Sequence, residues 1–233
     1  MSEPNEYGGE RPDFAWIPEP SGLGKMFAGA KRKRAIADGT SLRVFVFPWG
    51  VSWLNGGIWT QAQWEDLTQV FQEITSHSTN SVATHTDYRY TLHLADGRSI
   101  AFYGTLPARQ ARKSKAVNLE AVPASTVPVT LEQLGRLLVA GVTRVQLPKA
   151  IERFNAGETV AFGPLAVSKF GISTGDESVP WSEIEGVQTL MGKVSVKKSG
   201  KWLAWKKTDV GSIPNYFVFQ AFVRAVLDQR GRS

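Results

Sequence analysis

An internal repeat constrains this chain more than any other feature of its sequence. Residues 49–51 (Trp-Gly-Val) form an aromatic-Gly-aliphatic bend, and a Trp-x-x-aliphatic-x-x-Val segment follows at residues 64–70. The same bend returns at residues 170–172 (Phe-Gly-Ile), and the same segment returns at residues 181–187. The repeat predicts two copies of one structural unit, which 233 residues can accommodate as two small domains.

Each half continues with a predicted β-hairpin. In the first half, Gly97 lies in an Asp-Gly pair between the run at 88–94, which alternates apolar and polar residues, and the run at 99–103. An Asp-Gly pair in this setting is a strong hairpin signal. In the second half, Gly200 occupies the same place between strand-like residues at 193–205.

A helix is predicted to close each half. Thr130 can cap the first helix because Gln133 follows three residues later, and leucines and valines then recur at helical spacing. We expect Pro148 to begin a separate short helix, since proline interrupts a continuous one. Pro214 is placed at the first turn of the last helix.

These elements predict an α+β protein that is mainly β. A small antiparallel sheet buries one face and needs a cover, which the closing helix supplies. We therefore expect two tandem domains, each a small antiparallel sheet or barrel closed by a C-terminal helix. Trp64 and Trp181 should begin equivalent strands and lie buried beneath those helices. The predicted division is a flexible tail at 1–24, a first domain at 25–157 with a loop at 107–128 and a closing helix at 130–154, and a second domain at 158–233 with a helix at 214–229.

The same motifs resemble a known family. The resemblance covers most of residues 26–230 and is better in the second half; it rests on residues 90–98 (YTLHLADGR), 162–165 (FGPL), 180–184 (PWSEI), 200–202 (GKW) and 213–219 (IPNYFVF). They are similar to uncharacterised actinobacterial proteins of the DUF6585 type. The resemblance implies tandem pleckstrin-homology-like (PH-like) domains and no established activity.

Composition limits the chemistry that the chain can perform. It has no cysteine, which excludes disulfides, thiolate metal sites and a cysteine nucleophile. Hydrophobic residues make up 42% of the chain, enough for real cores. No apolar run reaches the ~18 residues of a membrane span, and the polar, acidic residues 1–14 do not look like a signal peptide. We expect a cytoplasmic protein, with peripheral attachment to a membrane left open.

Basic residues gather in three places, and the formal net charge is +6. One cluster lies at 109–115. The candidate residues for binding an anion or a partner are in the other two: Lys31, Arg32, Lys33 and Arg34, and then Lys193, Lys197, Lys198, Lys201, Lys206 and Lys207. Trp202 and Trp205 lie within the last group, and because they are three residues apart at least one should face the core. A solvated surface that protects strand edges is the alternative interpretation of these lysines.

No catalytic or cofactor motif stands out. Residues 21–26 resemble a phosphate loop only faintly, because Glu19 and Met26 occupy positions that need Gly and Ser or Thr. The three histidines, His77, His85 and His93, are not expected to bind a metal, which needs three or four convergent ligands. We expect no cofactor, no metal and no small-molecule substrate.

The predicted function is that of a non-catalytic interaction module. Its partner would be a protein or an anionic lipid surface, to which a basic chain is attracted. Two alternatives stay open. One is nucleic-acid binding through the basic clusters, and the other is an enzyme of unknown type with a site between the domains.

Overall fold

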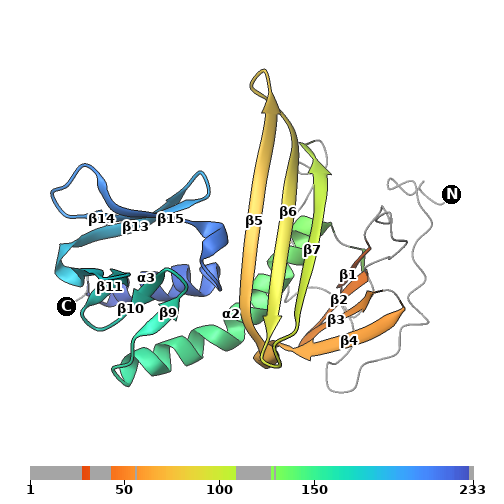
Figure 1. Ribbon diagram of the computed structural model, residues 1–233, viewed down its shortest axis with the longest axis horizontal. Coiled ribbons are helices and arrows are strands. Elements are labelled where there is room, and N and C mark those ends of the chain that lie inside the picture. The colour runs from red at the N-terminus through yellow and green to blue at the C-terminus, as the bar shows by residue number, and fades with distance from the viewer. Residues whose placement is uncertain (1–27, 32–42, 56, 109–126, 129, 231–233) are drawn as a thin grey trace.

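The computed structural model describes residues 28–31, 43–55, 57–108, 127–128 and 130–230 (Figure 1). The predicted tail at 1–24 and most of the predicted loop at 107–128 lie outside these residues. The same holds for the faint phosphate-loop motif at 21–26 and for the basic cluster at 109–115.

The first half contains two sheets separated by a single 3-10 turn. The first sheet has the order β4-β3-β2-β1-β8 and is antiparallel except between β1 and β8, and the second is the antiparallel meander β5-β6-β7. The elements are β1 (Ala28–Lys31), β2 (Arg43–Phe47), β3 (Gly50–Asn55), β4 (Ile58–Gln63), η1 (Trp64–Asp66), β5 (Leu67–Thr79), β6 (Val82–Leu94), β7 (Ser99–Pro107) and β8 (Val127–Pro128).

The second half repeats this order after the long helix α2 (Leu131–Asn155). A four-stranded sheet β12-β11-β10-β9 precedes a 3-10 turn, the meander β13-β14-β15 follows, and a helix ends the half. The elements are β9 (Val160–Phe162), β10 (Leu165–Val167), β11 (Gly171–Thr174), β12 (Glu177–Pro180), η2 (Trp181–Glu183), β13 (Ile184–Leu190), β14 (Lys193–Lys198), β15 (Ala204–Asp209), η3 (Val210–Ser212) and α3 (Tyr216–Arg230).

Among the described residues the protein is mainly β with few helices, as the sequence predicted, but each half contains two small sheets where one was expected. The barrel that the prediction allowed is wrong, because the described residues form no closed barrel. The physical reason lies in the 3-10 turns. Each turn redirects the chain after a strand, so the next strand starts a new sheet instead of extending the previous one.

Trp64 and Trp181 occupy equivalent places in the repeat. Each begins a 3-10 turn, and each is buried, with 2% and 4% of its surface exposed. The indole N–H of Trp64 donates to the carbonyl of Pro48 at 3.0 Å, and that of Trp181 donates to Ser168 at 2.8 Å. The acceptor lies in the turn before β3 in one half and before β11 in the other, so both hairpins are tied to a tryptophan in the same way.

The sequence interpretation of these segments needs two corrections. The tryptophans do not begin strands. Each is the first residue of a 3-10 turn, and β5 or β13 begins only after that turn. The hairpin of β5 and β6 is not among the predicted hairpins, and each of its strands has 13 residues. Its turn is formed by Asn80 and Ser81, which both have positive φ angles (50° and 63°). This hairpin projects from the body of the molecule (Figure 1), and we call it the finger.

Helix α2 belongs to both halves. Its N-terminus has the predicted capping box, in which the Thr130 hydroxyl accepts from the Gln133 backbone N–H at 3.2 Å. Its first turns pack in the core of the first half through Leu134, Leu138 and Val142. Its last turns pack in the core of the second half through residues 150 and 154.

The predicted break at Pro148 is wrong, because Pro148 lies inside one continuous helix. A proline in a helix interior loses one backbone hydrogen bond and costs about 3 kcal/mol. Here both ends of α2 are anchored in separate cores, and their burial outweighs this cost. The last helix also starts later than expected. Pro214 precedes it, and the carbonyl of Asn215 accepts its first intrahelical hydrogen bond, from Phe219.

Asn215 joins the two halves directly. Its side-chain Oδ1 accepts from the Val70 N–H at 2.9 Å, and its Nδ2 donates to the Thr68 carbonyl at 2.8 Å. Its own backbone N–H donates to the Val70 carbonyl at 2.9 Å. Asn215 has a φ of 52°, a conformation that asparagine tolerates better than most residues. The start of α3 is thus bound to β5 by three hydrogen bonds.

Candidate functional site

The six lysines of the third cluster lie on the two hairpins of the last meander. Lys193, Lys197 and Lys198 are in β14, Lys206 and Lys207 are in β15, and Lys201 is in the loop that joins the two strands. We call β13, β14, β15 and their two turns the lysine-rich hairpins. The strands are held in place because Val194 and Val196 of β14 are buried in the core of the second half.

Strand register divides these lysines between two faces. Residues paired across antiparallel strands point to the same side of the sheet. Lys207 pairs with Ser195, and within β14 the side chains of Lys193, Ser195 and Lys197 alternate with the buried valines, so all three lysines lie on the outer face. Lys206 pairs with the buried Val196 and lies on the inner face, where it is half-buried. The cluster is therefore not one flat array of six charges.

Two of the six lysines are neutralised by carboxylates. Lys193 lies 2.8 Å from Asp209, and Lys198 lies 3.1 Å from Glu183. Within the described part of the chain, Lys197, Lys201, Lys206 and Lys207 make no ion pair. Of these four, Lys197 and Lys207 lie on the outer face and Lys201 lies in the loop, where an external anion can approach them.

The turns of the lysine-rich hairpins carry exposed apolar side chains. The turn between β13 and β14 presents Leu190 and Met191, which are 73% and 93% exposed. The loop between β14 and β15 presents Trp202 and Leu203, which are 93% and 79% exposed. Trp205 packs against the core of the second half, which confirms the prediction that one of the two tryptophans faces inward.

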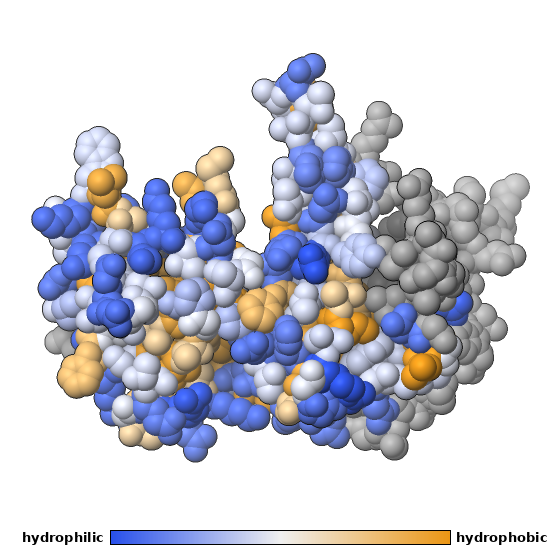
Figure 2. All heavy atoms as spheres, viewed as in Figure 1, coloured by the Kyte–Doolittle hydropathy of each residue, from blue (hydrophilic) through white to orange (hydrophobic). Residues whose placement is uncertain are grey.

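Both turns project to the same side of the molecule. In Figure 1 the β13–β14 turn and the β14–β15 loop rise from the meander in the direction of the finger. Figure 2 shows hydrophobic atoms at the ends of two projections over this half, above a belt of hydrophilic side chains. We call the residues Leu190, Met191, Trp202 and Leu203 the apolar tips. The apolar tips and the lysines therefore belong to the same three strands and their turns.

The other predicted basic residues lie outside the lysine-rich hairpins or outside the described residues. Lys31 ends β1 in the first half. Arg32, Lys33 and Arg34 lie outside the described residues. Of the three basic clusters, the third is the one that the structure describes in full.

Sequence reasoning missed Leu190 and Met191 as surface residues. The sequence does indicate this exposure, because a methionine in a Met-Gly turn between two strands has no sheet face against which to pack. Met191 has a φ of 50° and Gly192 a φ of 72°, a pair of positive angles typical of a tight type I′ hairpin turn. Leu190 pairs with Lys193 and so lies on the outer face, where nothing covers it.

Two comparisons with known proteins bear on this half. Residues 124–232 match a family described as "Family of unknown function (DUF6585)", which supports the resemblance drawn from the sequence. The match includes α2 and nearly all of the second half. No curated protein matches the chain. The actinobacterial origin implied by the resemblance stays a prediction.

Among the helices of the described residues, none is both long and apolar enough to cross a bilayer.

Proposed function

We propose that this protein is a non-catalytic module of two tandem PH-like domains, and that its second domain binds an anionic membrane surface from the cytoplasmic side. The repeated order of sheet, 3-10 turn, meander and closing helix supports the tandem PH-like assignment. The observation that carries the function is the pair of apolar tips above unpaired lysines.

The apolar tips suit a lipid interface. A tryptophan ring is amphipathic and is enriched at the headgroup level of membranes. Leu203 beside it, and Leu190 and Met191 at the other tip, would leave water for the upper acyl region. Two separate tips on one side of the molecule can insert together, which fixes the orientation of the domain on the surface.

The lysines supply the electrostatic part of the affinity. Each basic side chain near an anionic leaflet contributes roughly 1 kcal/mol. Lys197, Lys201 and Lys207 lie on the outer face or at the loop, near the tips. Three such contacts would contribute about 3 kcal/mol, and the inserted tips add to this.

A protein partner fits this surface less well. Stable protein interfaces bury about 800 Å² on each partner and need a continuous patch. The apolar tips are two short projections with polar side chains between them (Figure 2). A single nucleic-acid strand would stack its bases on aromatic rings, and here only Trp202 among the tips offers one.

Removing one apolar tip tests the proposal. We expect the double variant Trp202→Ala/Leu203→Ala to bind phosphatidylserine vesicles at least ~10-fold more weakly, because burying one Leu side chain contributes about 1.5–3 kcal/mol and each ~1.4 kcal/mol is a factor of ten. The measurement is co-sedimentation with vesicles of phosphatidylserine and phosphatidylcholine. The melting temperature should not change, since both side chains are exposed.

The matched control is Ile58→Ala/Phe170→Ala. Ile58 and Phe170 are 71% and 88% exposed but lie on β4 and on the turn before β11, which are not part of the lysine-rich hairpins. This control should bind vesicles as the natural chain does. Equal losses of vesicle binding in the two double variants would contradict the membrane proposal. Binding of the natural chain to a single-stranded oligonucleotide but not to vesicles would contradict it as well.

A further inference from the structure

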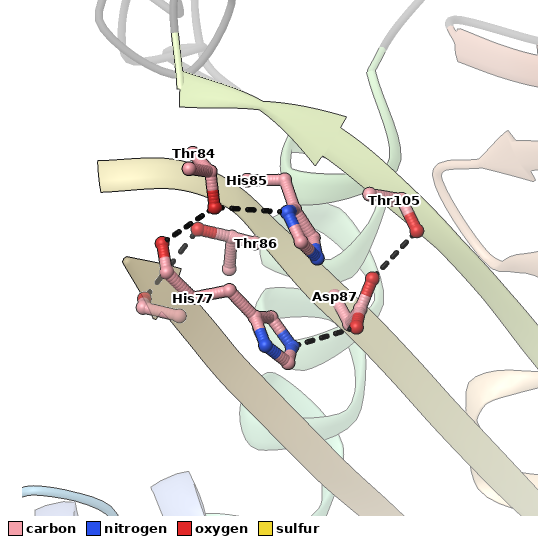
Figure 3. Close-up of polar contacts among 7 residues, drawn as sticks. His77, Thr84, His85, Thr86, Asp87 and Thr105 are labelled. Atoms are coloured by element: carbon pink, nitrogen blue, oxygen red, sulfur yellow. Dashed lines mark hydrogen bonds and ion pairs between the residues drawn. The ribbon is translucent and has the colours of Figure 1, made fainter. Parts of the chain in front are cut away.

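Two histidines and an aspartate meet on one face of the finger. His77 of β5 pairs in register with His85 of β6, and Asp87 follows two residues later on the same face of β6. Their ligand atoms all lie within 4.8 Å of one another, and all three residues are half-buried (Figure 3). His77 Nε2 is 2.9 Å from Asp87 Oδ2, and the two imidazole rings stack at a centroid distance of 4.3 Å.

The cluster depends on the turn of the finger. Asn80 and Ser81 form that turn, and the register shifts by one residue between His77 and Ser78. This shift sets His77 directly across from His85. In the sequence the two are eight residues apart in a stretch rich in Ser and Thr, so only the register reveals that they face each other.

Neighbouring threonines fix the orientation of the three groups. The Thr105 hydroxyl of β7 donates to Asp87 Oδ1 at 2.5 Å, and Thr84 Oγ1 lies 3.1 Å from His85 Nδ1. These contacts leave His85 Nε2 and Asp87 Oδ2 directed toward the centre of the cluster (Figure 3). The Thr105 hydrogen bond, aided by His77, holds the pKa of Asp87 below its usual range.

We propose that His77, His85 and Asp87 form a binding site for one divalent transition-metal ion, with Zn²⁺ as the ion that the ligands suit. Two imidazoles favour zinc and similar metals, whereas Mg²⁺ and Ca²⁺ prefer oxygen ligands. Bond lengths of about 2.0–2.2 Å place tetrahedral ligand atoms roughly 3.3 Å apart. The His77 Nε2–Asp87 Oδ2 distance of 2.9 Å is slightly shorter than this spacing, and rotation of the half-buried His85 side chain can bring its Nε2 to the same ion. The fourth position opens to solvent.

The threonine contacts match what a metal site requires. Ligating histidines and carboxylates are held by hydrogen bonds from a second layer of residues, which fixes their orientation. Thr105 supplies such a bond to Asp87 from a third strand, β7. The competing explanation is that the cluster stabilises the finger without any metal, through the His77–Asp87 ion pair and the stacked rings.

Zinc titration of the untagged full chain tests the proposal. The chain contains three histidines and no cysteine, so every imidazole that can bind Zn²⁺ is known. We expect saturable calorimetric binding of one Zn²⁺ per chain and none of Mg²⁺. His77→Gln and His85→Gln should each weaken Zn²⁺ binding at least ~10-fold, as should Asp87→Asn. His93→Gln is the matched control, since His93 lies on β6 against Phe71 and outside the cluster.

A second measurement uses the natural chain alone, so it does not depend on how any variant folds. Imidazole NMR signals of the natural chain should shift for His77 and His85 when Zn²⁺ is added, and the signals of His93 should not. The proposal is overturned if Zn²⁺ does not bind at one equivalent. It is also overturned if the signals of all three histidines change alike, or if His93→Gln weakens binding as much as His77→Gln does.

Discussion

Replacing Trp181 with alanine is expected to lower the free energy of unfolding by about 3–5 kcal/mol, the usual range for truncating a large buried aromatic side chain. Trp181 is 4% exposed and belongs to the core of the second half. The substitution removes the ring from that core and also the hydrogen bond that its indole N–H donates to the Ser168 carbonyl. That carbonyl then keeps the longer hydrogen bond from the Gly171 N–H, at 3.3 Å, but loses the shorter one.

Chemical denaturation followed by circular dichroism measures this loss. Trp64→Ala should cost a similar amount, because the ring of Trp64 is 2% exposed and donates the equivalent hydrogen bond to Pro48. Trp202→Ala is the control. Its side chain is 93% exposed, and its loss should change stability by less than ~0.5 kcal/mol. A loss below ~1 kcal/mol for Trp181→Ala would show that the two tryptophans are not equivalent core residues.

Reversing the unpaired charges of the lysine-rich hairpins should strongly weaken vesicle binding. We expect the triple variant Lys197→Glu/Lys201→Glu/Lys207→Glu to bind phosphatidylserine vesicles at least ~100-fold more weakly than the natural chain. Losing three attractive contacts removes about 3 kcal/mol, and three glutamates add repulsion from the anionic surface. Lys193 and Lys198 are left in place because Asp209 and Glu183 already neutralise them. Co-sedimentation over a range of salt concentrations measures the effect.

The control for charge reversal is Lys149→Glu/Lys169→Glu/Arg224→Glu. These exposed residues lie on α2, on the turn before β11 and on α3, and their reversal changes the net charge by the same amount. If binding follows total charge alone, both triple variants lose it equally, and the lysine-rich hairpins have no special role. Binding by the natural chain should also weaken with salt, since screening shortens to ~8 Å at physiological ionic strength.

The sequence predicted the repeat and its anchors because these depend on local patterns. Trp64 and Trp181 recur with the same neighbours, and each is buried at the same point of its half. The finger could not be predicted in this way. Residues 75–87 are mostly Thr, Ser, Ala and His, so neither face of those strands shows a hydrophobic alternation.

The candidate site was only partly predictable for the same reason. The composition of residues 193–207 identified the lysines, but not which of them are paired. Pairing depends on register, and β14 has irregular pairing with both of its neighbours. The bulge in β15 at Trp205 leaves this side chain against the core, while Trp202 extends into solvent. Strand register and bulges depend on residues that are far apart in the sequence, so a local sequence pattern does not predict them.

Insertion of the apolar tips into a membrane can be followed with a fluorescent label on one of them. The chain has no cysteine, so Leu203→Cys provides a single thiol for a polarity-sensitive fluorophore. On mixing with phosphatidylserine vesicles, the emission of this label should shift to the blue as the tip enters the lipid interface. The same label on Phe170→Cys, at the turn before β11, should not shift. An unchanged emission at position 203, or equal shifts at both positions, would contradict insertion through these tips.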